Sequence, residues 1–296
     1  MYDARSSSGS GQKSGIIFGV LTVCVVAAAF FGVLLMPGGS KDKPTLISGT
    51  AGAETQLLTV LDDAATKKYI NTLTRVSPRA AKKLDAKVTD ALADGADKNE
   101  LAVLVMEAMQ EDVISDMKYL AKADIRHIDG IVGASKSSLQ KLSSSNSKWC
   151  KGSTYESFAD MGPAQVEAKV RREFGYGSGA YTWGLDMQVR VLEAIEDAKV
   201  NPKSYGRMTA KDEQAVQMLS MRLISDPQVM KLMSLGGQDK AAMARAVKGM
   251  DFCRLAVTGL GALQSLPKGT RERMWSDAFA QMDLNNLDKM MRMSAF

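Results

Sequence analysis

Residues 54–73 read ETQLLTVLDDAATKKYINTL, and the apolar residues of this stretch recur at intervals of three and four. Such spacing places side chains on one side of an α-helix. The stretch therefore predicts one amphipathic helix of about 20 residues. Its core-facing side would carry Leu57, Leu58, Leu61, Ala65, Tyr69 and Leu73.

Start and stop signals for two further helices follow directly. Ser77-Pro78 offers a capping hydroxyl and then a proline for the first turn of a helix that ends near Gly95. Asp97 can cap a longer helix that reaches Leu120. These signals indicate three helices in succession from residue 54 onward.

The remainder of the chain also favours helices over strands. Asp129-Gly130 follows a helical pattern and is interpreted as a helix end. β-strands are indicated by runs of alternating apolar and polar residues that end in tight turns. The sequence contains no such runs. We predict an all-α fold, a multi-helix bundle, with additional helical segments at residues 163–174, 185–200, 209–225, 238–265 and 270–293.

Residues 15–36 (GIIFGVLTVCVVAAAFFGVLLM) form an uncharged apolar run. A helix of this length spans about 33 Å, close to the hydrocarbon thickness of a bilayer. A secretory signal peptide is the alternative, but its apolar core is shorter and ends at a small-residue cleavage site, whereas this run ends in Leu35-Met36-Pro37. We predict a single transmembrane helix near the N-terminus, followed by a soluble multi-helix bundle.

The orientation of this predicted span is not decided by charge, because two basic residues lie on each side of it. The usual single-pass layout places the large domain outside the cytoplasm, so we expect a periplasmic or extracellular domain. Gly15 and Gly19 have the small-x-x-x-small spacing that lets two membrane helices approach closely. Self-association through this face is one interpretation, and the ordinary abundance of glycine in such helices is the other.

Composition shifts divide the chain into segments. Residues 1–14 are a short polar tail, and residues 37–53, rich in Gly, Pro, Ser and Thr, are expected to form a flexible tether. We predict a helical subdomain over 54–145, a loop region rich in Cys, Gly and aromatic residues over 146–184, and a Met-rich helical subdomain over 185–296. A long insertion within one domain is an equal alternative to the boundary near residue 146.

Charge argues against nucleic acid as a partner. The net charge of +5 is spread along the chain, and no run of basic residues is longer than two. Nucleic-acid binders normally show a basic stripe with interleaved aromatic residues.

Two of the three cysteines, Cys150 and Cys253, lie outside the predicted span, which contains Cys24. In an oxidising compartment they make one natural disulfide pair. Two unrelated buried thiols are the alternative.

Metal and cofactor chemistry has little support. The single histidine, His127, cannot supply a His-rich zinc site, and no Gly-x-Ser-x-Gly elbow accompanies it to suggest a serine hydrolase. No Walker A or Rossmann glycine pattern is present. We expect no cofactor and no metal.

Three short segments, Glu156-Ser157, Ala164-Gln165-Val166 and residues 179–184 (GAYTWG), follow one another within about 30 residues. Their order resembles the motifs of lytic transglycosylases: a Glu-Ser pair with the catalytic acid, a Gly-Leu-Met-Gln-like segment and an Ala-Tyr-Asn-Ala-Gly-like segment. Here the Gly-Leu-Met is lacking, and Thr182-Trp183 stands where Asn-Ala is expected. The resemblance implies a cell-wall glycan hydrolase with Glu156 as general acid, its pKa raised by an apolar pocket.

Methionine is abundant, with 12 of the 19 residues from Met208 onward. Methionines fill irregular cores and also line adaptable binding grooves, and core filling is the ordinary interpretation. Near the C-terminus an amphipathic segment offers candidate partner-binding residues, Leu284, Leu287, Met290 and Met291. The sequence thus favours a membrane-anchored helical module that binds another protein, a subunit of an envelope or membrane assembly, over the hydrolase.

Overall fold

The computed structural model describes residues 53–156, 161, 165, 168, 169, 175–233, 245 and 247–280. This part of the chain is helical and forms no strand, so the predicted all-α class is confirmed. Two 3-10 helices are present, η1 (Met117–Lys122) and η2 (Lys148–Cys150). The α-helices are α2 (Ala53–Val60), α3 (Ala64–Val76), α4 (Pro78–Ala93), α5 (Lys98–Asp116), α6 (Ile125–Ser144), α7 (Gly152–Glu156), α9 (Gly179–Val200), α10 (Ala210–Ile224), α11 (Pro227–Met233), α13 (Phe252–Gln264) and α14 (Lys268–Ala280).

The predicted membrane segment is not among these helices. Residues 15–36 lie outside the described residues, as do the predicted tail and all but the last residue of the tether. Among the residues described, no helix is both long enough and apolar enough to cross a membrane. The transmembrane helix therefore stays a prediction.

The single helix predicted over residues 54–73 is wrong, because the chain turns between α2 and α3. Asp63 has an extended backbone, and its carboxylate accepts hydrogen bonds from the Thr66 backbone N–H at 2.9 Å and from the Thr66 hydroxyl at 2.6 Å. An aspartate in this geometry caps a new helix instead of continuing the old one. The predicted apolar side is nonetheless buried, with Leu61 and Tyr69 fully enclosed.

The helix end predicted at Asp129-Gly130 is also wrong. Both residues lie inside α6, which Asp124 caps by accepting a hydrogen bond from the Arg126 backbone N–H. Glycine and serine have weak helix propensity, which is why the pattern suggests an end here. α4 begins at Pro78 as predicted, but the side chain of Ser77 makes no capping hydrogen bond.

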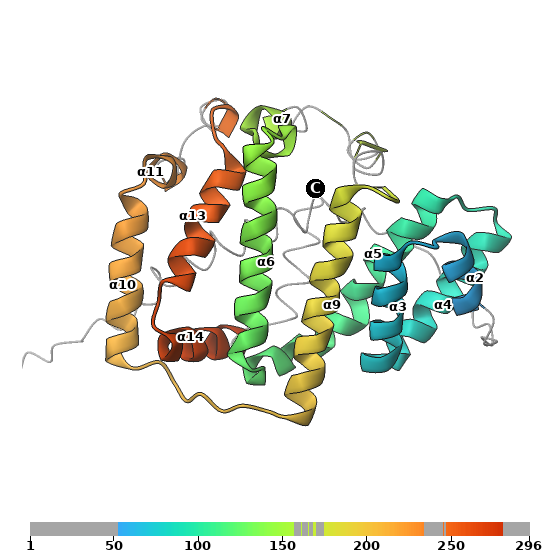
Figure 1. Cartoon of the computed structure of the whole chain (residues 1–296), viewed down its shortest axis with the longest axis horizontal. Helices are drawn as coiled ribbons and strands as arrows, with labels where there is room; N and C mark the ends of the chain where they lie inside the picture. The colour runs from blue at the N-terminus through green and yellow to red at the C-terminus, as the bar shows by residue number, and fades with distance from the viewer. Residues whose placement is uncertain are drawn as a thin grey trace, which may run out of the picture.

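α6 lies at the centre of the molecule, with α9 on one side and α13 on the other (Figure 1). Beyond α9 lie α2 to α5, which share a core with it; buried residues of this core include Leu61, Leu73, Leu101, Leu185 and Ile195. Beyond α13 lie α10 and α11, and α14 lies below α13, between the lower ends of α10 and α6 (Figure 1). α9 thus packs on helices that precede residue 146, and the subdomain boundary predicted there stays a prediction.

α6 contacts α13 through two apolar clusters. Near the start of α6, Ile125, Ile128 and Val132 pack with Leu260 of α13 and with Trp275 and Phe279 of α14. Near its end, Leu139 packs with Cys150, Cys253 and Ala256. The two clusters together fix α13 against α6.

A buried carboxylate, Asp212, fixes the start of α10. Asp212 is 1% exposed, and Arg273 of α14 donates to it from Nε at 2.7 Å and from Nη2 at 2.8 Å. The hydroxyl of Thr270 donates to it at 2.7 Å, and Thr209 completes a capping box with it. The Arg273 guanidinium holds the pKa of Asp212 well below its usual value of 3.8.

We predict that Asp212→Asn lowers the free energy of unfolding at neutral pH by about 2–3 kcal/mol, because it leaves buried donors without an ionised partner. The pKa of Asp212 is lower in the folded than in the unfolded chain. Its stabilisation is therefore complete above about pH 4 and is lost as the pH falls further. The difference between variant and wild type should shrink below that pH, as measured by thermal unfolding at a series of pH values.

The matched control is Glu213→Gln, since Glu213 is exposed and lies in the same turn of α10. It should change stability little at any pH. Equal effects of the two substitutions would contradict the role assigned to Asp212.

Candidate functional site

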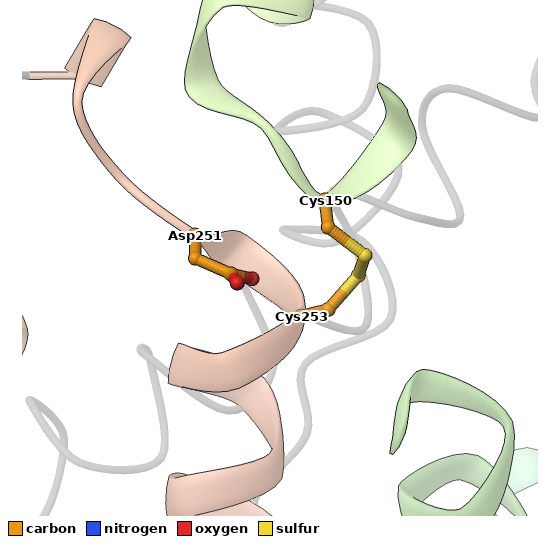
Figure 2. A group of neighbouring side chains, drawn as sticks. All are labelled: Cys150, Asp251 and Cys253. Atoms are coloured by element: carbon orange, nitrogen blue, oxygen red, sulfur yellow. A yellow bond between two sulfur atoms is a disulfide. The ribbon is translucent and has the colours of Figure 1, made fainter. Parts of the chain in front are cut away.

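The sulfur atoms of Cys150 and Cys253 lie 2.03 Å apart, and the two Cα atoms are 4.9 Å apart (Figure 2). Cys150 ends η2, and Cys253 lies in the first turn of α13. Both are buried, with exposed fractions of 3% and 0%. The predicted pairing is confirmed in that the two cysteines are at disulfide distance.

The backbone around this disulfide is also closely joined. The Gly152 N–H donates to the Met250 carbonyl at 2.8 Å, and Lys151 forms an isolated antiparallel bridge with Asp251. A Cβ atom at Gly152 would lie 1.7 Å from the Val247 carbonyl oxygen, so only glycine fits at this approach. The disulfide therefore stabilises a contact that the backbone already makes.

Asp251 lies beside the two cysteines, and the three potential ligand atoms are within 4.8 Å of one another (Figure 2). Each residue already has another role, because the sulfurs bond to each other and Asp251 caps α13 by accepting from the Arg254 N–H. A structural zinc site uses four ligands, and a cysteine binds zinc as a thiolate, which it cannot form while it is in a disulfide. The arrangement is that of a disulfide and a helix cap.

His127 pairs with Asp197, the two atoms Nε2 and Oδ2 being 3.3 Å apart. Arg126 Nη2 lies 3.2 Å from the other oxygen of the same carboxylate. These contacts join the first turn of α6 to the last turn of α9. His127 thus helps to hold two helices together, which is the structural role that its isolation in the sequence suggests.

Glu156 is the last residue of α7. The structure does not describe its neighbour Ser157, nor Ala164 and Val166 of the middle motif. The third motif forms the start of α9, where Tyr181 is only 1% exposed. Its hydroxyl lies 2.7 Å from the Thr66 hydroxyl, and burial raises its pKa. Tyr181 packs α9 onto α3, and a catalytic role for Glu156 stays a prediction.

The candidate partner-binding residues Leu284, Leu287, Met290 and Met291 also lie outside the described residues. The structure shows another candidate surface that sequence reasoning missed. Four large apolar side chains of α10 and α11 are exposed, with exposed fractions of 55% for Met218, 56% for Met221, 40% for Ile224 and 54% for Met230.

Met218, Met221 and Ile224 lie on the outward side of α10, and we call these three residues the methionine face. The opposite side of the helix is buried and carries Val216, Leu219 and Leu223. A helix with apolar residues on two sides normally packs on two sides. This double pattern is the signal in the sequence that could have indicated the surface.

The interpretation of methionines as core residues holds for Met250 and Met274, which are 2% and 3% exposed. It fails for Met218, Met221 and Met230. The methionine face lies on α10, at the edge of the molecule away from α2 to α5 (Figure 1).

Comparison of the chain with protein-family models, with curated proteins and with solved structures finds no match.

We predict that replacing both cysteines (Cys150→Ala with Cys253→Ala) lowers the Tm by about 10 °C. The disulfide closes a loop over a sequence separation of 103 residues, and long loops gain the most from closure in the chain-entropy model. Reductant should lower the Tm of the wild type toward that of the variant. Cys24→Ala is the matched control, and a Tm that depends on Cys24 but not on the pair would contradict the prediction.

Proposed function

We propose that the chain is a membrane-anchored helical module that binds another protein, as a subunit of a membrane or envelope assembly. The observation that carries this proposal is the methionine face on the outer side of α10. Large apolar side chains that remain exposed together on a folded domain commonly mark a contact surface.

The composition of this outward side supports a protein partner. Its centre is uncharged, since Gln214 and Gln217 lie between the apolar residues on the helical wheel. The centres of protein interfaces are likewise depleted of charge and enriched in methionine. Methionine also adapts its unbranched side chain to an irregular partner surface.

Charged residues lie at the borders of the same side. On the helical wheel, Lys211 and Arg222 border one edge, and Glu213 borders the other. A polar rim around an apolar centre is the usual anatomy of a protein interface.

The predicted transmembrane helix at residues 15–36 supplies the anchor in this proposal. An extracytoplasmic location of the domain is supported by the Cys150–Cys253 disulfide, because disulfides persist mainly in oxidising compartments. The anchor would keep the domain near the membrane, and the methionine face would meet its partner there.

We predict that a photo-cross-linking amino acid at Gln217 of the full chain, illuminated in its native membrane, gives one discrete adduct with a partner protein. Gln217 is exposed and borders Met218 and Met221. The substitution Met221→Lys should lower the adduct yield by about tenfold, because it places a charge in the apolar centre. Gel mobility and mass spectrometry measure the yield and the partner.

The control position is Asn71, which is exposed on α3, on the other side of α6 and α9 from α10 (Figure 1). It should give no such adduct, and Met221→Lys should leave the Tm unchanged because the side chain is exposed. The same adduct from both positions, or none from Gln217, would refute the proposed surface.

A further inference from the structure

We propose that Met218 and Met221 form a methionine-oxidation site, at which a peroxide converts the methionine face from an apolar to a polar surface. The susceptibility of these two residues to a peroxide rests on their exposure alone. The consequence for binding rests on the function proposed above.

Exposure separates Met218 and Met221, together with Met230 of α11, from the buried methionines of the domain. More than half of each side chain of Met218 and Met221 is exposed, whereas Met250 and Met274 are 2% and 3% exposed. A peroxide must approach the thioether sulfur directly, so access controls the rate of this reaction. The chain thus contains both reactive positions and buried internal controls.

Cysteines do not compete for the oxidant in the described part of the chain. Cys150 and Cys253, the cysteines that this part contains, are buried and joined to each other. A disulfide sulfur has already lost the thiol that a peroxide attacks most readily. Exposed thioethers are then the most accessible sulfur groups on this surface.

The reaction is balanced with hydrogen peroxide as the co-reactant. The thioether sulfur forms a bond to one peroxide oxygen and is oxidised by two electrons, while the O–O bond breaks. The other oxygen leaves as water, which takes up both hydrogens. Methionine sulfoxide reductases reverse the change, so the modification can act as a switch.

The positions of Met218 and Met221 on α10 let their oxidation change the polarity of the methionine face. Met218 and Met221 are three residues apart on α10, so their side chains are neighbours on the helix surface. Each sulfoxide oxygen requires a hydrogen-bond partner, and burial against an apolar surface leaves it without one. The buried side of α10 is untouched, since Val216, Leu219 and Leu223 pack in the core. Oxidation would therefore alter the surface and leave the fold intact.

The first test uses the full chain in detergent micelles with graded hydrogen peroxide, followed by proteolysis and mass spectrometry. We expect Met218 and Met221 to gain an oxygen about tenfold faster than Met250 and Met274, while the far-ultraviolet spectrum stays unchanged. Equal rates at all four positions, or oxidation only after loss of the helical signal, would overturn the proposal. This test does not involve a partner.

The second test measures the effect on binding. The chain with the photo-cross-linker at Gln217 is oxidised in micelles, freed of peroxide, and returned to membranes that lack the native chain. We expect the adduct yield to fall by about tenfold and to recover after treatment with methionine sulfoxide reductase. An unchanged yield would overturn the switch, whereas no adduct from the untreated chain would overturn the proposed function and leave the oxidation result standing.

Discussion

The packing of α6 between α9 and α13 is the contact on which the remainder of the structure depends. On one side, α6 meets α13 through Val132 and Leu139, beside Leu260 and Ala256. On the other side it meets α9, where the Ser135 hydroxyl donates to the Met187 sulfur. α9 belongs to the core of α2 to α5, and α13 belongs to the core of α10, α11 and α14, so α6 joins two groups of helices. The groups also meet directly, because Phe279 of α14 packs against the first core and the Ser276 hydroxyl donates to the Ala121 carbonyl. The glycines and serines of α6 have weak helix propensity, and tertiary packing on two sides compensates for it.

α14 fixes the second group of helices to α6 through polar contacts. Arg271 binds Asp129 of α6 with two hydrogen bonds of 2.8 and 2.9 Å, and Arg273 binds Asp212 of α10 with a similar pair. Such two-point contacts fix orientation as well as distance. At the other end of α13, the disulfide ties Cys253 to η2. These contacts fix α10 on its neighbours, and such pre-organisation would lower the entropic cost of the proposed binding.

Sequence periodicity identified the buried sides of helices better than their ends. Leu61 and Tyr69 are buried as predicted, yet Asp63 divides their helix, because a capped turn can leave the apolar spacing nearly unchanged. α6 was missed because helix propensity is a local property, whereas this helix is stabilised by neighbours that are distant in sequence. The cysteine pair could be predicted because only two candidates remained outside the predicted span. For the methionine face, periodicity indicates that α10 has two apolar sides, but it does not show which of the two is covered.

The fold itself does not account for that outer side. α10 is fixed by its capping box, by the Asp212–Arg273 contact and by its buried side, and none of these involves Met218 or Met221. Lysine or glutamate at either position would have nearly the same helix propensity as methionine and would expose no apolar side chain. Stability and solubility together would thus be served at least as well by charged residues. The two exposed thioethers are the feature that both the proposed contact surface and the proposed oxidation site require.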